Sequence, residues 1–120
     1  MQYLIAALIL VILDFPWLYF QLPASQRMFS KIQGGRSLTM RLWAAIPVYL
    51  ALAYILVNMK SVEQSALTGA ACYAVYDFTN LLTFKDYTLQ FAIQDTLWGG
   101  VLFSLAYMVL KKDYDWPIWF

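Results

Sequence analysis

Long apolar runs alternate with short polar segments along the chain, and this pattern predicts four membrane-spanning helices. A helix needs about 20 mainly apolar residues to cross the hydrocarbon core of a bilayer. The runs of about this length cover residues 3–20, 42–58, 65–84 and 88–110. Only tight polar turns separate the second run from the third and the third from the fourth. We therefore expect an all-α integral membrane protein, with four antiparallel transmembrane helices forming a bundle in the single domain 1–120.

Residues 23–35, between the first two runs, follow a different pattern. Met28, Phe29 and Ile32 share one face of a helix in this register, and polar residues occupy the other face. The pair Gly34-Gly35 is a typical helix end. The pattern predicts a short amphipathic helix that lies in the membrane interface. An irregular polar loop is the alternative, since so short a helix is marginal by itself.

The first run could instead be a cleaved signal peptide. Such a peptide begins with a basic segment, but no Lys or Arg precedes Arg27, and Asp14 interrupts the apolar stretch. We therefore expect a retained span, kinked at Pro16.

Residues 111–120 form an aromatic tail after the fourth run. Amphipathic rings prefer the headgroup level of a membrane. The tail is thus expected to fold back onto the membrane or onto a partner.

Composition agrees with a membrane protein and excludes other classes. Apolar residues make up 62% of the chain and charged residues 12%, whereas soluble domains carry about 25% charged residues. A net charge of +1 gives no basic surface for nucleic acid. The chain has no His, the usual zinc ligand and general base, and its one Cys, Cys72, permits no intrachain disulfide. We expect no cofactor.

The positions of Lys and Arg predict the orientation. The connections after the first and third runs carry five basic residues, Arg27, Lys31, Arg36, Arg41 and Lys85. The opposite side carries three, Lys60, Lys111 and Lys112. The positive-inside rule therefore places both termini outside the cytoplasm.

Three aspartates, Asp14, Asp77 and Asp95, interrupt the apolar runs, and no Lys or Arg lies within those runs. Each is six or seven residues from the run end that borders a basic connection. At 1.5 Å per residue, all three lie about 10 Å below the same membrane face. Burying each charged carboxylate costs about 2.5–3.5 kcal/mol. The carboxyls therefore carry protons, accept hydrogen bonds, or hold a hard cation such as Na⁺ or Mg²⁺ rather than a soft metal.

Polar side chains that could serve these carboxyls gather mainly in the third run. Tyr73, Asp77 and Asn80 fall at i, i+4 and i+7 and share one helical face. The candidate proton- or ion-binding set comprises Asp14, Asp77, Asp95, Asn80, Tyr73, Tyr76, Thr79, Trp17 and Trp98.

Asp14-x-x-Trp17 and Asp95-x-x-Trp98 repeat one spacing. Because the first and fourth spans should run in opposite directions, the repeat suggests an inverted arrangement like those of many transporters. The alternative is a chance match in which both tryptophans are bulky packing residues near the aromatic belt.

The chain resembles a family of small predicted membrane proteins, best known from bacterial genomes and described only as a domain of unknown function. The resemblance is carried by Leu13-Asp14-x-x-Trp17-Leu18, Tyr76-Asp77-Phe78-Thr79-Asn80-Leu81 and Asp95-x-x-Trp98-Gly99. It extends from Tyr3 to about Leu110 and implies four spans and one polar cluster, without implying an activity. The chain departs from the family pattern in its aromatic tail, in Pro16 and in lacking a basic residue near the N-terminus.

Three functional classes fit these features. The sequence favours an intramembrane carboxylate cluster that binds or translocates a proton, a hard cation or a small polar solute. The alternative is a structural or accessory subunit of a larger membrane complex. Either role implies the lipid bilayer and a homo-oligomer or other membrane subunits as partners.

An enzyme is the third and least favoured class. Tyr76-Asp77 is similar to the first motif of intramembrane aspartyl proteases, whose two carboxyls share a proton. Their second motif, Gly-x-Gly-Asp, is absent, because Ala92-Ile93-Gln94 precedes Asp95. We assign no catalytic residue.

Overall fold

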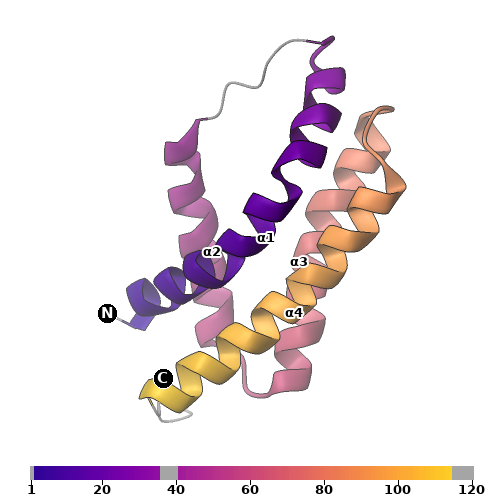
Figure 1. Ribbon diagram of the computed structural model, residues 1–120. Helices are drawn as coiled ribbons and strands as arrows, with labels where there is room; N and C mark the ends of the chain where they lie inside the picture. Colours follow the sequence, from indigo (N-terminus) through magenta and orange to yellow (C-terminus); the bar gives the residue numbers. More distant parts are fainter. Residues whose placement is uncertain (1, 36–40, 115–120) are drawn as a thin grey trace.

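The computed structural model describes residues 2–35 and 41–114, with side chains described as far as Lys111. It contains four α-helices, and the residues it describes form no strand. The helices are α1 (Gln2–Ile32), α2 (Ala45–Val57), α3 (Val62–Thr83) and α4 (Leu89–Tyr114), with a single 3₁₀ turn, η1 (Leu42–Ala44), leading into α2 (Figure 1). The all-α prediction is confirmed.

The helix boundaries follow local signals. Ser61 caps α3 by accepting a hydrogen bond from the Gln64 backbone N–H at 3.0 Å, and the Gln64 side chain accepts one from the Lys60 N–H at 2.7 Å. A tight turn after Phe84 leads into α4, where Thr88 Oγ1 accepts from the Phe91 N–H at 3.1 Å. Helix α4 continues to Tyr114, so the predicted tail begins as helix, and its residues 115–120 lie outside the described part.

Helix α1 is longer than predicted. It runs without a break through Pro16 and Pro23, and it changes direction near its middle (Figure 1). The prediction of a separate interfacial helix over residues 23–35 is therefore wrong. The predicted stop is present, because Gly34 and Gly35 adopt φ values of 72° and 88° and the Gly35 N–H reaches the Ser30 carbonyl at 2.8 Å.

Tertiary contacts explain why the second half of α1 continues the helix. Met28 is buried against Tyr87 and Ala92, and its sulfur accepts the Thr88 backbone N–H at 3.4 Å. Phe29 packs edge-on against Tyr87. The apolar face that was expected to lie on lipid is thus covered by the connection between α3 and α4.

The helices pack around α1 and α4. Helix α1 contacts α2 and α4, and α3 forms an antiparallel hairpin with α4 (Figure 1). The beginning of α1 and the end of α4 lie at the same end of the molecule.

Two apolar clusters stabilise opposite ends of the bundle. The larger joins α1, α2 and α4 and includes Leu10, Leu56 and Phe103. The smaller contains Met28, Tyr87 and Ala92. In sequence, Asp14 lies between the two clusters on α1, and Asp95 and Trp98 lie between them on α4. The aspartates therefore occupy a middle layer of the bundle.

Two helices of the described residues are long and apolar enough to cross a membrane, Gln2–Ile32 and Leu89–Lys111. The segment Leu42–Val57 is apolar but shorter.

Helices α3 and α4 approach most closely at two glycines. A Cβ on Gly99 would lie 2.5 Å from the Tyr73 ring and 2.6 Å from the Gly69 carbonyl oxygen. Neighbouring Gly100 is less confined, because a Cβ there would lie 3.1 Å from the Ala66 carbonyl oxygen. The closest approach of the two helices is therefore at Gly69 and Gly99.

We expect Gly99→Ala to lower the free energy of unfolding by about 1–3 kcal/mol, because overpacking exceeds the gain in helix propensity of about 1 kcal/mol. Gly100→Ala is the matched control and should change stability much less. Thermal unfolding of both variants in detergent, followed by circular dichroism, checks this. Equal stabilities would contradict the close approach.

Candidate functional site

A polar layer crosses the middle of the bundle and links all four helices. We use this name for Asp14, Trp17, Tyr49, Asp77, Tyr87, Asp95 and Trp98. Its aspartates are the three that interrupt the apolar runs.

Helices α1 and α4 exchange tryptophan–aspartate hydrogen bonds. Trp98 Nε1 on α4 donates to Asp14 Oδ1 on α1 at 2.7 Å. In return, Trp17 Nε1 on α1 donates to Asp95 Oδ1 on α4 at 3.2 Å. The two indoles stack between these bonds, with ring centroids 5.2 Å apart and planes 10° from parallel.

The repeated Asp-x-x-Trp spacing explains this reciprocity. Residues at i and i+3 lie on one helical face, one turn apart. When two such helices pack in opposite directions, the Asp of each faces the Trp of the other. The repeat therefore acts as a local two-fold contact between α1 and α4.

Asp14 is buried and fully hydrogen-bonded. Its second oxygen, Oδ2, accepts from the Tyr49 hydroxyl of α2 at 2.5 Å. One carboxyl thus ties α1 to both α2 and α4, with a donor on each oxygen.

Asp77 is completely buried but only partly satisfied. Its Oδ1 accepts from the Tyr87 hydroxyl at 2.6 Å. Its Oδ2 is also buried, and no N–H or O–H donor among the described residues reaches it. Burial, together with the hydrogen bond to Asp77, raises the pKa of Tyr87, so this hydroxyl stays protonated and remains a donor.

The group beside Asp77 is the carboxyl of Asp95, which lies within hydrogen-bonding reach. Two carboxylates repel each other, whereas a carboxylic acid and a carboxylate form a short hydrogen bond. The pair can therefore hold one proton between two helices. Trp17 supports Asp95 from the α1 side.

Tyr73 lies next to the layer without donating to it in the hydrogen bonds described. Its ring covers Gly99 at the α3–α4 contact, and its hydroxyl is close enough to interact electrostatically with all three aspartates.

The other predicted members lie outside the carboxyl contacts. The Asn80 amide is beside the hydroxyls of Tyr76 and Tyr87. Tyr76 and Thr79 are exposed on the outer side of α3. Of the expected donors to the aspartates, Trp17 and Trp98 fill that role, while Tyr73, Tyr76 and Asn80 do not in the hydrogen bonds described.

Two donors were missed by sequence reasoning, Tyr49 and Tyr87. Tyr49 lies seven residues into the run 42–58, at the same predicted depth as the aspartates, so the depth argument could have found it. Tyr87 is in a turn outside the predicted spans, and no sequence signal pointed to it.

The described residues contain no group of three or more His, Cys, Asp or Glu side chains arranged to hold a metal ion. The carboxyls are instead arranged as one satisfied group, Asp14, and one pair, Asp77 with Asp95. This geometry suits proton binding better than coordination of a cation by all three.

Residues 1–110 match the family described as "Predicted membrane protein (DUF2177)". The chain belongs to this family. The predicted resemblance to small membrane proteins of unknown function is thus confirmed. No curated protein and no solved structure matches the chain. The DUF2177 assignment covers all four helices apart from the last residues of α4.

We expect Trp98→Phe to destabilise this DUF2177 protein by about 1–3 kcal/mol, because it leaves a buried oxygen of Asp14 without its donor. Trp17→Phe should lower the free energy of unfolding less, because the hydrogen bond from Trp17 to Asp95 is longer and Asp95 is less buried than Asp14. Trp43→Phe is the control, because Trp43 is 68% exposed. Unfolding in a denaturing detergent titration measures all three, and a Trp98→Phe protein as stable as the control would contradict the reciprocal bonds.

Proposed function

We propose that this DUF2177 protein is a four-span membrane protein that binds a proton between Asp77 and Asp95. The bound proton is itself translocated, or its binding and release drive the translocation of a small polar solute. The observation that carries the proposal is the buried Asp77 carboxyl, which has one oxygen without a donor and has the carboxyl of Asp95 as a neighbour. Intramembrane carboxyl groups typically mark proton relays and solute pathways.

The distribution of side chains supports the four-span topology. Large apolar residues face outward on every helix, while Asp14, Ser65 and Asp77 are the buried polar residues of the described part. The inward face of helix α3 carries the buried polar residues Ser65 and Asp77. Its outer face, by contrast, carries Leu67, Val75 and Leu82, which are 74%, 70% and 86% exposed. Such an outward apolar surface suits a bilayer.

The hydrogen bonds around the pair support exchange of a proton with one side. Tyr87 contacts Asp77 and belongs to the connection between α3 and α4, on the side of the basic residues. A proton has a short route from that connection to the carboxyl pair. A homo-oligomer would enclose a route to the other side.

A structural or accessory subunit is the second candidate, favoured by Asp14. Both of its oxygens are satisfied, and its bonds connect three helices, as expected of a residue that holds helices together. In this role the polar layer would fix the shape that a larger complex recognises.

The topology proposal has a direct test. In a Cys72→Ala background, we expect Gln26→Cys to react with a membrane-impermeant thiol reagent only after the membrane is opened. Lys60→Cys, between α2 and α3, should react from outside. Both side chains are exposed, so access depends on the side of the membrane. The reverse labelling pattern would invert the orientation. Equal labelling of the two cysteines in the closed membrane would contradict the multi-pass topology.

We expect Asp77→Asn to abolish proton flux into liposomes while leaving thermal stability within about 1 kcal/mol of the wild type. The Asn oxygen can still accept from Tyr87, and its NH₂ group can donate to Asp95 in place of the shared proton. Flux is measured with a trapped pH-sensitive dye, with and without candidate solutes. Glu63→Gln, on the exposed first turn of α3, is the flux control and should behave as wild type.

Asp14→Asn provides the matched comparison for stability. Both oxygens of Asp14 accept hydrogen bonds, so an NH₂ group would face an existing donor and should cost about 1–3 kcal/mol. If the wild-type oligomer conducts no more than empty liposomes, the proton proposal fails and the structural role is favoured. If Asp77→Asn destabilises the protein as much as Asp14→Asn does, the shared proton is contradicted.

A further inference from the structure

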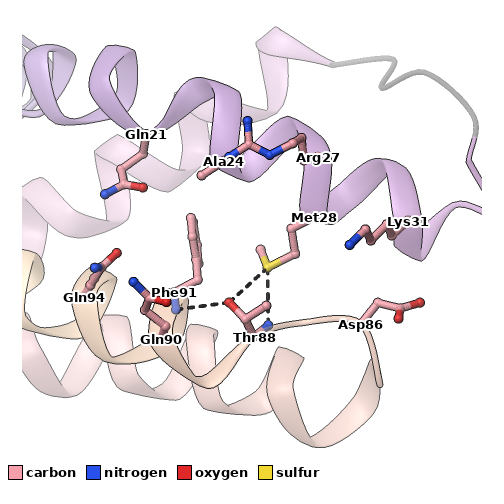
Figure 2. Close-up of a pocket in the computed structure, with 10 residues that line it drawn as sticks. All are labelled: Gln21, Ala24, Arg27, Met28, Lys31, Asp86, Thr88, Gln90, Phe91 and Gln94. Atoms are coloured by element: carbon pink, nitrogen blue, oxygen red, sulfur yellow. Dashed lines mark hydrogen bonds between the residues drawn. The ribbon is translucent and has the colours of Figure 1, made fainter.

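A polar pocket of about 310 Å³ lies between the second half of α1 and the start of α4 (Figure 2). It is separate from the polar layer, because none of the seven residues of that layer lines it. Its walls carry Arg27 and Lys31 from α1 and Thr88 from the turn directly before α4. Three amides, those of Gln21, Gln90 and Gln94, gather at one end.

The charge of the pocket favours an anion. Arg27 and Lys31 form no ion pair with any described carboxylate. Asp86, the acidic residue of the lining, stands at the edge of the pocket in Figure 2. Two cations and several amide N–H donors form a set that recognises phosphate oxygens.

An apolar groove continues directly from the polar pocket. The groove shares Gln21 and Gln94 with the pocket, and its other walls are Trp17, Phe20, Leu97, Trp98 and Val101. A second apolar groove shares Leu97 and Val101 with the first and extends along α4 past Gly100 and Ser104. Polar pocket and grooves therefore form one continuous amphiphilic surface.

The position of this surface matches a membrane boundary. Gln21 directly follows the apolar run that ends at Phe20. Gln94, on α4, lies opposite Gln21 at the same end of the pocket. The cationic part lies on the side of the basic connections, and the apolar part lies along the predicted spans. An occupant with a phosphate at one end and a hydrocarbon chain at the other would satisfy both parts.

We propose that this surface binds one anionic phospholipid, with its phosphate-bearing headgroup between Arg27 and Lys31 and an acyl chain in the groove along α4. Headgroup phosphate and free inorganic phosphate share the same chemistry, and the contiguous apolar groove selects the lipid. The inference rests on the four-span topology of the proposed function and is independent of the proton pair.

The test uses the full-length protein purified in detergent, with lipid binding followed by native mass spectrometry. Phosphatidylglycerol and phosphatidylcholine with identical acyl chains are the lipid probes, and inorganic phosphate is the soluble probe. We expect the Arg27→Gln, Lys31→Gln double variant to bind phosphatidylglycerol about 25-fold more weakly, at about fivefold for each basic residue. Arg41→Gln, Lys85→Gln is the matched control, since it removes two exposed charges outside the pocket and should retain wild-type affinity.

A second pair of variants tests the groove. Val101→Trp should fill it and weaken both lipids, whereas Val75→Trp, on the exposed face of α3, should change neither affinity. If the charge variant fails to fold, the wild type decides the matter, because added salt should reduce its preference for phosphatidylglycerol.

Two results would overturn the proposal. Equal affinity of the wild type for the two lipids would remove the anionic headgroup site. Displacement of phosphatidylglycerol by inorganic phosphate, with unchanged lipid affinity in Val101→Trp, would assign the pocket to free phosphate instead. If the cysteine labelling contradicts the four-span topology while the preference for phosphatidylglycerol persists, the topology proposal fails and the lipid site stands.

Discussion

Buried carboxyl groups need hydrogen-bond donors, and in this protein the donors come from different helices. Asp14 on α1 accepts hydrogen bonds from α2 and α4, and Asp95 on α4 accepts one from α1. Asp77 on α3 accepts a hydrogen bond from the turn that leads into α4. Each bond between helices in a membrane contributes only about 0.6 kcal/mol on average, but an unpaired carboxylate there costs several times more. The need to satisfy the carboxyls therefore restricts which helix arrangements are possible.

The two most buried aspartates meet this need differently. Asp14 has a donor on each oxygen and is a closed structural junction. Asp77 has one donor and one carboxyl neighbour, so its surroundings depend on where a proton resides. The close glycine contact between α3 and α4 brings this pair together, because it brings the two backbones near enough for short side chains to meet. Packing of small residues and chemistry of carboxyls are thus linked in the same helical hairpin.

Trp17 and Trp98 belong to two features at once. Their N–H groups donate to aspartates inside the bundle, and their rings line the apolar groove on its surface. The two indoles stack on each other where the polar layer borders the groove. A molecule in the groove would therefore touch the same side chains that hold two of the three carboxyls.

Hydropathy alone determined the all-helical class and three of the four helices to within a few residues, and it predicted that the aspartates share one layer. These features depend on local composition and on the fixed rise of a helix, both of which can be read along the chain. The Asp-x-x-Trp repeat, together with the opposite directions expected of the first and fourth spans, also suggested an inverted arrangement. The tertiary structure decided the rest. It made residues 23–35 part of α1, because Met28 and Phe29 are covered by Tyr87. It chose Tyr49 and Tyr87 as donors in place of Tyr73 and Tyr76, because which hydroxyl reaches a carboxyl depends on how helices are rotated and packed against one another, and sequence periodicity does not contain that information.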